Sequence, residues 1–324
     1  MKPIAFYQDE FSQHLEEFNS FSEPKNLYQP ISYILSLGGK RLRPVLTLMT
    51  TDIFGGNFKD ALNAALCVEV FHNFSLIHDD IMDDAPLRRG QVTVHEKWDL
   101  NTGILSGDAM LILSYRLLES YENEQFKSLM TLFSETALQV CEGQQYDVDF
   151  ETRNDVIVDQ YIRMIAYKTA VLVAAAMKMG AIIAKTTPQN QNSIYEYGYN
   201  LGIAFQLQDD YLDAFGDTET FGKQIGGDII ENKKTYLYLK ALELGSKNDK
   251  KVLLELFNSE SNTSEEKINT VKEIFETSGA VIQTKAAIES YTKKAFSVLE
   301  NLAISDEKKM GLRHFGEQLM QRKV

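Results

Sequence analysis

Residues 71–83 read FHNFSLIHDDIMD, an apolar run that ends in an aspartate pentad of the form DDxxD. The run FQLQDDYLD at 205–213 repeats this arrangement. On a helix, residues four apart share a face and lie about 6 Å apart along the axis. Each pentad therefore predicts a helix that presents two carboxylates together. The predicted pairs are Asp79 with Asp83 and Asp209 with Asp213, and Asp80 and Asp210 are the second aspartates of the two pentads.

The apolar flanks of the pentads argue against a solvated acidic face. The chain has 46 acidic residues, so a single pentad could be surface charge. However, Phe74 and Ile77 precede the first pentad and Ile203 and Leu207 precede the second, and these residue types are usually buried. Like charges crowded near a core cost free energy unless cations offset them. The pattern therefore favours a metal at each pentad.

The type of ligand points to the type of metal and substrate. Mg²⁺ prefers oxygen ligands and is usually held by one or two carboxylates together with substrate phosphates. Paired aspartates thus predict Mg²⁺ and a phosphate-bearing substrate, with the two pairs able to hold the metal from opposite sides. The residues do not distinguish Mg²⁺ from Mn²⁺.

Basic residues interleave with the pentads, as a diphosphate site requires. The segment GGKRLRP at 38–44 contains Lys40 and Arg43, which we expect to project together. Arg88 and Arg89 follow the first pentad, and guanidinium groups match phosphate oxygens well. Each cation alone would be typical of a surface charge. The remaining members of this set are Lys168 with Thr169, Lys223 and Lys233.

These motifs, in this order, resemble the trans-type polyprenyl synthetases, the isoprenyl diphosphate synthase family. The resemblance runs through GGKRLRP (38–44), FHNFSLIHDDIMDDAPLRRG (71–90), Lys168-Thr169, FQLQDDYLD (205–213) and the glycine-rich segment that ends near Thr235. It implies an all-α fold of the isoprenoid synthase type, a helical bundle around a central active-site cavity. It also implies a single polyprenyl synthetase domain over residues 1–324 and a homodimer.

The resemblance implies a role for each matching residue. Asp79, Asp83, Asp209 and Asp213 would bind Mg²⁺, as three ions together with the substrate diphosphate, and Asp80 and Asp210 would be catalytic neighbours. The allylic diphosphate would be bound by Arg88, Lys168, Thr169, Gln206, Lys223 and Lys233, of which Arg88, Lys168 and Lys223 would also be catalytic. Isopentenyl diphosphate would be bound by Lys40, Arg43, His72 and Arg89.

The implied reaction is a magnesium-dependent head-to-tail condensation of isopentenyl diphosphate with dimethylallyl, geranyl or farnesyl diphosphate. Cations stabilise charge where it develops, on the departing diphosphate, so that the allylic C–O bond can break. The isopentenyl double bond attacks the resulting carbocation. A proton is then lost to the released diphosphate in the family's usual account, so we expect no dedicated side-chain base.

Three positions keep an alternative. His72 alone would be typical of a core histidine, but its place seven residues before Asp79 matches the family, and His78 is expected to face elsewhere. Lys233 and Lys234 follow Asn232 where the family usually has Gly-Lys, so either lysine could contact diphosphate. The four glycines within 216–227 predict a lid, with a plain surface loop as the alternative.

Two phenylalanines bear on product length. Phe74 and Phe71 lie five and eight residues before Asp79, on the helix face below it. As core residues they would be ordinary. In the family, large side chains here resemble the floor of a short elongation pocket, and they predict a twenty-carbon product first and a fifteen-carbon product second.

Composition limits the partners and the compartment. The net charge of −13 without a sustained basic stripe excludes nucleic acid as the expected partner. The apolar run 171–184 is interrupted by Lys178 and is too short to span a bilayer, and residues 1–11 lack a signal-peptide pattern. We therefore expect a cytoplasmic protein. Cys67 and Cys141 are expected to be reduced thiols.

Helical periodicity runs through most of the chain, and strand-like alternation is scarce. The predicted helices are 61–80, 104–121, 128–147, 157–184, 193–215, 235–245, 265–276 and 279–300. The polar stretches 246–250 and 258–266 are predicted to be helix connections.

Three other functions fit part of the pattern. A metal-dependent phosphohydrolase could use His72, His78 and Asp79, but would not need the second pentad. A class I terpene cyclase would need the first pentad, but not a second diphosphate site at Lys40 and Arg43. A non-catalytic subunit of a heteromeric prenyl synthase would be expected to have lost motif residues, whereas both pentads are present.

Overall fold

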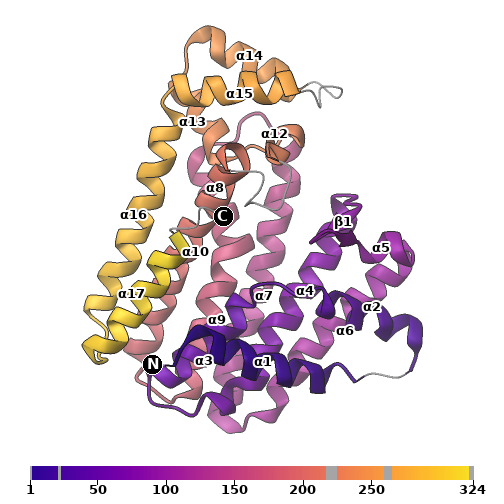
Figure 1. The fold of residues 1–324 in the computed structure, drawn as a ribbon, viewed down its shortest axis with the longest axis vertical. Helices are drawn as coiled ribbons and strands as arrows, with labels where there is room; N and C mark the ends of the chain where they lie inside the picture. The colour runs from indigo at the N-terminus through magenta and orange to yellow at the C-terminus, as the bar shows by residue number, and fades with distance from the viewer. Residues whose placement is uncertain (1, 21–22, 217–224, 259–264, 321–324) are drawn as a thin grey trace. The chain divides into compact units, whose positions relative to one another are not determined.

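The protein is all-α, as predicted. The computed structural model describes residues 2–20, 23–216, 225–258 and 265–320. Within these ranges the strands are limited to the two-residue pair β1 (Leu87–Arg88) and β2 (Gln91–Val92), which are antiparallel. The chain forms two compact units (Figure 1). The expected single domain stays a prediction.

Unit 1 comprises Met1–Ser134 and Ala175–Asn192 and contains the first pentad. Its elements are α1 (Ile4–Phe18), α2 (Lys25–Ser36), α3 (Leu42–Ile53), the 3₁₀ turn η1 (Phe58–Ala61), α4 (Leu62–Met82), the β1–β2 hairpin, α5 (Val94–Lys97), α6 (Leu100–Leu117) and the 3₁₀ turn η2 (Leu118–Ser120). The helix α7 (Asn123–Thr152) begins in this unit, and most of α9 (Val171–Ile183) belongs to it.

The helix α4 is the centre of unit 1, and glycines let its neighbour approach closely. It packs mainly against α6 and α3. A Cβ added at Gly103 of α6 would lie 2.9 Å from Ile81 Cδ1, and one added at Gly107 would lie 2.2 Å from His78 Nε2. Both glycines thus leave room for side chains of the last turns of α4. The end of α4 that carries the first pentad is thereby held in place.

Unit 2 comprises Glu135–Ala174 and Ser193–Val324 and contains the second pentad. Its elements are the rest of α7, α8 (Val158–Ile165), the π-helical turn η3 (Ala166–Ala170), most of α10 (Pro188–Phe215), α12 (Gly227–Ile230), α13 (Tyr236–Leu244), α14 (Lys247–Phe257), α15 (Glu265–Thr277), α16 (Ala280–Glu300) and α17 (Asp306–Met320). In Figure 1, α16 and α17 lie side by side, in agreement with their packing contacts, and α16 also packs against α13.

The predicted helices correspond to α4, α6, α7, α8 to α9, α10, α13, α15 and α16, and this part of the prediction is confirmed. The prediction of a connection at 246–250 is wrong, because α14 begins at Lys247. Ser246 caps it: Asp249 N–H donates to Ser246 Oγ at 3.2 Å, and Ser246 N–H donates to an Asp249 carboxylate oxygen at 3.0 Å. This capping box is a start signal that outweighs the polar composition.

The run from Val158 to Ile183 is longer than the predicted apolar segment. It passes through η3 and, by length and composition alone, would suffice to cross a membrane. However, 78% of its most apolar window is buried inside the structure. Such burial is typical of a core helix, and the run is weak evidence for a membrane span.

Candidate active site

The first pentad occupies the last turn of α4. Asp79 is mostly buried, with 18% of its side chain exposed, while Asp83 is exposed and is the C-cap residue. The C-terminal end of a helix carries partial negative charge, so carboxylates are unfavourable there. A cation at Asp79 and Asp83 would remove this penalty.

Asp80 faces away from solvent and anchors Arg88. Only 1% of Asp80 is exposed, and its Oδ1 accepts hydrogen bonds from Arg88 Nε at 2.8 Å and from Nη2. Burial raises the pKa of Asp80, and Arg88 partly opposes this rise. Burial acts to lower the pKa of Arg88, but the charges of Asp80, Asp79 and Asp83 outweigh it, so the net change is a rise. Arg88 Nη2 also lies 3.8 Å from Asp79 Oδ2, which places the guanidinium beside the first metal-ligand candidate.

Arg89 lies against the glycines of the GGKRLRP segment. Its Nη1 donates to the Gly38 carbonyl, and a Cβ at Gly39 would meet the Arg89 guanidinium at 2.9–3.0 Å. Gly38 and Gly39 have φ of 77° and 119°, and Arg41 has φ of 48°. Two of these left-handed positions are glycine, which adopts them without strain. The loop thus folds tightly because of its glycines, and it presents backbone to Arg89.

His72 and Arg43 form the inner part of the same basic group. Arg43 Nη1 lies 3.2 Å from His72 Nε2. Because a guanidinium only donates, Nε2 is the acceptor, and we assign the ring proton to Nδ1. Burial, together with the charges of Arg43, Arg89, Arg88 and Arg41, holds the pKa of His72 well below 6.5. His72 is therefore neutral at pH 7 and offers one N–H donor.

The other two cations of the segment behave differently. Lys40 is exposed, and its backbone carbonyl accepts a hydrogen bond from Gln8 Nε2 at 3.1 Å. Arg41 forms an ion pair with buried Glu69 and donates to the Leu35 carbonyl. Arg41 is thus committed to holding the loop, a role that the sequence analysis missed.

Neutral donors anchor the second pentad. Asp210 is buried and accepts hydrogen bonds from the Tyr161 hydroxyl and, at 3.0 Å, from Gln206 Nε2. Gln206 Oε1 accepts in turn from Thr169 Oγ1 at 3.0 Å. The predicted residues Thr169, Gln206 and Asp210 are therefore linked in one chain of hydrogen bonds, and Asp209 is partly exposed beside them.

The second pentad lies in a concentration of negative charge. Burial, followed by the charges of Asp228, Asp213 and Asp147, holds the pKa of Asp210 well above its usual range, and Lys233 opposes the rise. Asp213 Oδ2 accepts a hydrogen bond from Asp228 N–H at 3.0 Å, and Gly226 N–H donates to the Asp213 carbonyl at 2.7 Å. Asp213 therefore also holds the start of α12. Like charge at this density is typical of a site that binds cations.

Lys168 is positioned by the π-helical turn η3. Its Nζ lies 2.6 Å from Asp147 Oδ2 of α7. A Cβ at Gly143 would lie 2.3 Å from Lys168 N, and one at Gly202 would lie 2.7 Å from Ala170 Cα. The turn is thus packed between two glycines whose lack of side chains admits its wider backbone. Single π turns inside helices are frequent at functional sites.

The two candidate lysines near α13 have different partners. Lys234 is buried, and its Nζ donates at 2.7 Å to the Phe150 and Glu151 carbonyls at the end of α7. Lys233 lies 2.7 Å from a Glu231 carboxylate oxygen, and its charge acts on Asp210. Lys234 thus holds a helix end, whereas Lys233 lies toward the second pentad. Lys223 and most of the predicted lid, residues 217–224, lie outside the described residues.

Phe71 and Phe74 belong to an aromatic cluster below the first pentad. Their ring centroids are 5.4 Å apart, and Phe71 contacts Phe133 edge-on at 5.3 Å. Tyr115 extends the cluster from α6, with its ring 4.8 Å from that of Phe133. Phe71 is fully buried and Phe74 is 8% exposed. The face of α4 below Asp79 is therefore filled by large rings, as the spacing predicted.

The donor sets of both pentads fit magnesium. Every candidate ligand is a carboxylate, the hard oxygen donor that Mg²⁺ prefers. The raised pKa of Asp210 reflects burial first and then neighbouring negative charge, and a divalent ion would neutralise that charge. Asp79 and Asp83 at the end of α4, and Asp209 with Asp213 near the end of α10, would hold it.

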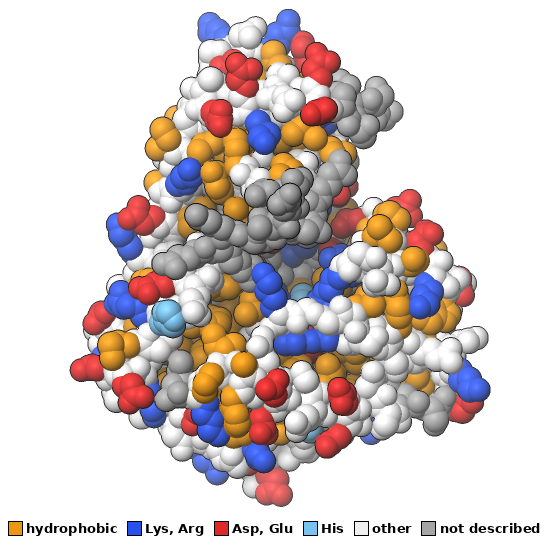
Figure 2. Space-filling model, viewed as in Figure 1, with side chains coloured by type: hydrophobic (Ala, Val, Ile, Leu, Met, Phe, Trp, Pro, Cys, Tyr) orange, Lys and Arg blue, Asp and Glu red, His pale blue; other side chains and the backbone are white. Residues whose placement is uncertain are grey.

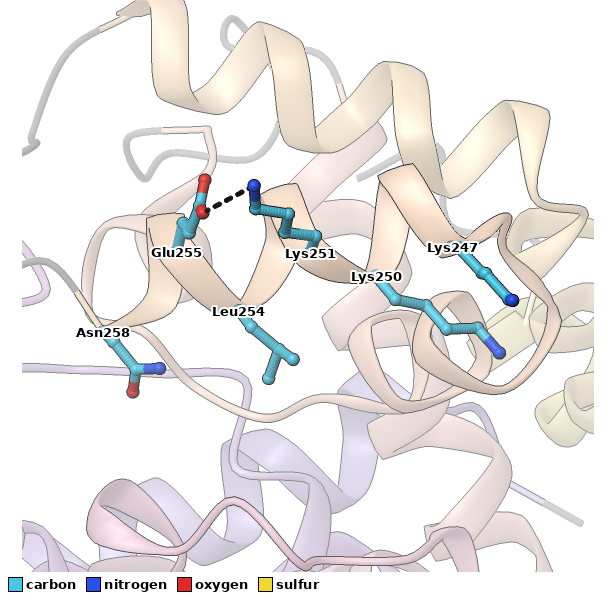
Figure 3. Close-up of a pocket in the computed structure, with 6 residues that line it drawn as sticks. All are labelled: Lys247, Lys250, Lys251, Leu254, Glu255 and Asn258. Carbon is cyan, nitrogen blue, oxygen red and sulfur yellow. Dashed lines mark ion pairs between the residues drawn. The ribbon is translucent and has the colours of Figure 1, made fainter.

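Other surface features are poorer candidates. A cavity of about 480 Å³ on α14 is lined by Lys247, Lys250, Lys251, Leu254, Glu255 and Asn258. Figure 3 shows that these side chains come from one exposed helix, where Lys251 pairs with Glu255 at 3.7 Å. The cavity contains no pentad residue. On the face drawn in Figure 2, acidic and basic side chains are intermixed.

Sequence reasoning missed four polar residues of these sites. Tyr161 and Arg41 gave no signal because their roles depend on distant partners. Asp147 lies on a helix without a recognisable motif, and Asp228 lies in the glycine-rich segment. Only Asp228 could have been found, because an aspartate directly after Gly226-Gly227 is suited to a tight phosphate or metal loop.

The fold is that of the all-α isoprenoid synthases. A crystal structure of a geranylgeranyl pyrophosphate synthase covers 100% of both chains with 56% identity and a TM-score of 0.96. The geranylgeranyl pyrophosphate synthetase of Pyrococcus horikoshii covers 98% of both chains, with 30% identity and a TM-score of 0.92.

Sequence comparison leads to the family. Residues 24–275 match the family described as polyprenyl synthetase. The short chain isoprenyl diphosphate synthase of Methanothermobacter thermautotrophicus is 36% identical over 307 residues, 94% of each chain. The geranylgeranyl diphosphate synthase of Methanosarcina mazei is 37% identical over 301 residues, 92% of this chain and 91% of the relative. The chain belongs to the polyprenyl synthetase family.

Proposed function

We propose that the protein is a short-chain isoprenyl diphosphate synthase that condenses isopentenyl diphosphate with allylic diphosphates and releases geranylgeranyl diphosphate. Farnesyl diphosphate is the second candidate product. The observation that carries this proposal is the pair of aspartate pentads near two helix ends, each with a buried second aspartate: Arg88 pairs with the first pentad, and the charge of Lys233 acts on the second. The named relatives and the family support the same prenyltransferase class.

The pentads divide their aspartates between two tasks. We assign metal binding to Asp79, Asp83, Asp209 and Asp213, and positioning to the buried second aspartates. Asp80 directs Arg88, and Asp210 directs Gln206. Asp79, Asp83 and Asp209 are exposed or half-buried and therefore accessible to an ion, whereas Asp213 is buried beside the start of α12. The second aspartates, Asp80 and Asp210, accept hydrogen bonds from protein donors. Mg²⁺, as three ions together with diphosphate, would supply electrostatic stabilisation of the leaving group.

Cations of the protein complete the charge stabilisation. Arg88, Lys168 and Lys233 would bind the allylic diphosphate oxygens. Arg88 lies 3.8 Å from Asp79, while Lys168 pairs with Asp147, and the charges of Asp147 and Lys233 both act on Asp210. Such donors are preorganised where negative charge grows as the C–O bond breaks, so they favour the transition state over the bound substrate. Lys223 is assigned to the same diphosphate from the family pattern alone. A polyprenyl synthase of Caulobacter crescentus, 26% identical, is described in complex with calcium and isoprenyl diphosphate.

The basic group around His72 would bind isopentenyl diphosphate. Arg43 and Arg89 supply charge, neutral His72 supplies an N–H, and Lys40 is exposed at the same loop. Four arginines act electrostatically on His72, which indicates a concentration of positive charge suited to a diphosphate. The bound isopentenyl group would then be held for attack on the allylic carbocation, and its proton would leave with the released diphosphate.

The aromatic cluster supports a short product. Phe74 and Phe71 fill the face of α4 below Asp79, and Phe133 and Tyr115 pack behind them. Because a second layer of rings backs the first, the floor resists displacement by a growing chain. We expect Phe74→Ala to lengthen the dominant product, and Phe133→Leu to lengthen it less.

Product analysis tests this proposal. Purified protein is incubated with Mg²⁺, labelled isopentenyl diphosphate and each of the five-, ten- and fifteen-carbon allylic diphosphates, and the products are resolved by length. A discrete twenty-carbon product that disappears on chelation is the expected result. A dominant product of thirty or more carbons would refute the short-chain assignment. Absence of elongation from folded protein would favour a cyclase, a hydrolase or a partner subunit.

We further propose a homodimer and a cytoplasmic location. Leu105 and Ile112 of α6 are each 60% exposed, and Ile104 is 39% exposed. Large apolar side chains gathered on one helix are suited to a protein interface. Light scattering of the purified protein would give the mass of a dimer, and Leu105→Glu would give that of a monomer. Cell fractionation would test the location.

A further inference from the structure

A histidine beside the first pentad is buried without a hydrogen-bond partner. His95 lies on α5, with 8% of its side chain exposed, and neither ring nitrogen has a hydrogen-bond partner among the described residues; Nε2 lies 3.9 Å from exposed Glu96 Oε1, beyond hydrogen-bond distance. An imidazole that leaves water without a hydrogen bond costs free energy, so native structures rarely contain one. The burial of His95 therefore indicates that its ring forms a hydrogen bond to a nearby partner.

The backbone around His95 ties it to the end of α4. Thr93 is the N-cap residue of α5, and its Oγ1 donates to the Ala85 carbonyl at 2.7 Å. Ala85 N–H donates to the Asp80 carbonyl at 2.9 Å. The His95 Cβ also lies 3.5 Å from the Cβ position of Gly103 on α6. The start of α5, two residues before His95, is thus joined by short hydrogen bonds to the turn that follows Asp80.

Asp80 has a buried acceptor atom that lacks a hydrogen-bond donor. Its Oδ1 accepts both hydrogen bonds from Arg88, while its Oδ2 is buried without a partner among the described residues. His95 acts electrostatically on the same carboxylate and lowers its pKa. A buried acceptor and a buried donor group therefore lie within electrostatic reach of each other, and one hydrogen bond would satisfy both.

We propose that His95 is a positioning residue of the active site: one of its ring N–H groups donates to Asp80 Oδ2, directly or through one ordered water. This bond fixes the carboxylate plane. The fixed plane aims Oδ1 at Arg88 and so sets the direction of the guanidinium. The effect on catalysis rests on the proposed function, because it acts through the binding of the allylic diphosphate by Arg88.

A metal is the competing partner for His95. Asp84, His95 and Glu96 offer ligand atoms that all lie within 4.8 Å of one another, a donor set that Zn²⁺ accepts. However, Asp84 and Glu96 are exposed, so water already solvates their carboxylates. The buried carboxylate of Asp80 is not solvated by water in this way. The cost of an unsatisfied acceptor therefore favours Asp80 as the partner, and zinc binding is an outcome that the experiment separates.

The test compares His95 variants that keep or remove the donor. His95→Phe keeps the ring without a donor, while His95→Asn and His95→Gln each supply an amide N–H at the place of one ring nitrogen. We expect His95→Phe to lower kcat/KM for the allylic diphosphate about tenfold, mostly through KM, and to leave KM for isopentenyl diphosphate within about twofold. One of the two amide variants should restore kcat/KM to within about threefold of wild type. Glu96→Gln is the matched control and should match wild type.

A double mutant tests whether His95 acts through Arg88. In the Arg88→Ala background, His95→Phe should have no further effect on kcat/KM, because the group it positions is gone. Full additivity of the two changes would overturn the proposal. So would equal losses in the Phe, Asn and Gln variants, since that result would show a packing role only. Circular dichroism and thermal melting of each variant check that it is folded.

A measurement without turnover separates this proposal from the proposed function. The ¹⁵N resonances of the His95 ring should show one protonated nitrogen in a hydrogen bond, and Asp80→Ala should shift them while Glu96→Gln should not. If wild type makes no prenyl diphosphate but the Asp80-dependent shift is present, the proposed function fails and the hydrogen bond stands. Zn²⁺ binding that is lost in both His95→Phe and Glu96→Gln, with resonances insensitive to Asp80→Ala, would overturn the proposal in favour of a metal.

Discussion

The two pentads share one sequence pattern but lie in different electrostatic environments. In the first, the buried second aspartate is neutralised by an arginine that also lies 3.8 Å from Asp79. In the second, Asp210 is held by the neutral donors Tyr161 and Gln206, and further carboxylates surround it. The first site thus has part of its compensating charge built into the protein. The second depends more on charge brought by an ion.

This difference shows what a motif conveys and what it omits. Helix periodicity predicts that the first and fifth aspartates share a face, and this holds wherever the helix forms. The charge that the site presents depends on partners from elsewhere in the chain. Two copies of DDxxD can therefore differ in metal affinity.

The largest expected effect comes from removing a ligand of either site. Asp79→Asn and Asp209→Asn should each lower turnover about a thousandfold, because charge on the leaving diphosphate loses its stabilisation. The comparison is sharpened by repeating the assay over a range of Mg²⁺ concentrations, since excess metal should rescue neither variant fully. Asp84→Asn, one residue beyond the first pentad, is the control and should match wild type. Near-normal turnover of either pentad variant would break the assignment.

The next effect separates an ion pair with a buried carboxylate from one with a partly exposed carboxylate, since Arg88 and Lys168 themselves are similarly exposed. Arg88→Ala leaves the buried Asp80 carboxylate without its partner and should lower the free energy of unfolding by about 3 kcal/mol. Lys168→Ala removes a cation whose partner, Asp147, is 22% exposed, so its cost should be below about 1 kcal/mol. Both variants should lose activity. Urea unfolding measures the two free energies, and equal values would contradict the distinction between the sites.

Two glycines give a smaller contrast between the units. Gly143→Ala brings a methyl group against the Lys168 backbone, which cannot rotate away, and should cost about 1–3 kcal/mol. Gly107→Ala meets only the His78 ring, which can rotate, and we expect it to cost less. Thermal melting checks the order of the two. Greater destabilisation by Gly107→Ala would show that the π-helical turn tolerates displacement.

The smallest expected effect is the pH dependence that comes from His72. Its pKa is held well below 6.5 in the folded protein, so the unfolded chain binds the proton first. Neutral His72 therefore makes its full contribution to the free energy of unfolding above pH 6.5. This contribution is lost as the pH falls toward the lowered pKa. Wild type should lose stability more steeply than His72→Asn as pH falls below 6.5. Urea midpoints at pH 7.5, 6.5 and 5.5 give the slopes, and parallel slopes would show that His72 titrates normally.

The sequence predicted the parts of the fold that depend on local pattern. The all-α class, the helix ends that carry both pentads and the aromatic face of α4 follow from periodicity and from a specific family pattern. The capped start of α14 was missed because polar composition was weighed above the Ser246–Asp249 pair. The π-helical turn could not be predicted, because it depends on Gly143 and Gly202 meeting it from other helices.

The residues of the candidate site were predicted individually from the sequence, but the different role of each residue was not. The structure links Thr169, Gln206 and Asp210, and it links Arg43 to His72. It also shows that Lys234 is committed to carbonyls at the end of α7. Burial and partners decide such roles, and neither can be read from spacing alone. The assignments of metal and substrate ligands remain predictions for the experiments above.

Counting bound metal ions tests most directly whether both aspartate pentads bind metal. Manganese, used as a paramagnetic substitute for Mg²⁺, is titrated into the protein in the presence of inorganic diphosphate and is followed by electron paramagnetic resonance. We expect three ions per chain in wild type, and fewer in both Asp79→Asn and Asp209→Asn. An unchanged count in either variant would show that this pentad does not bind metal.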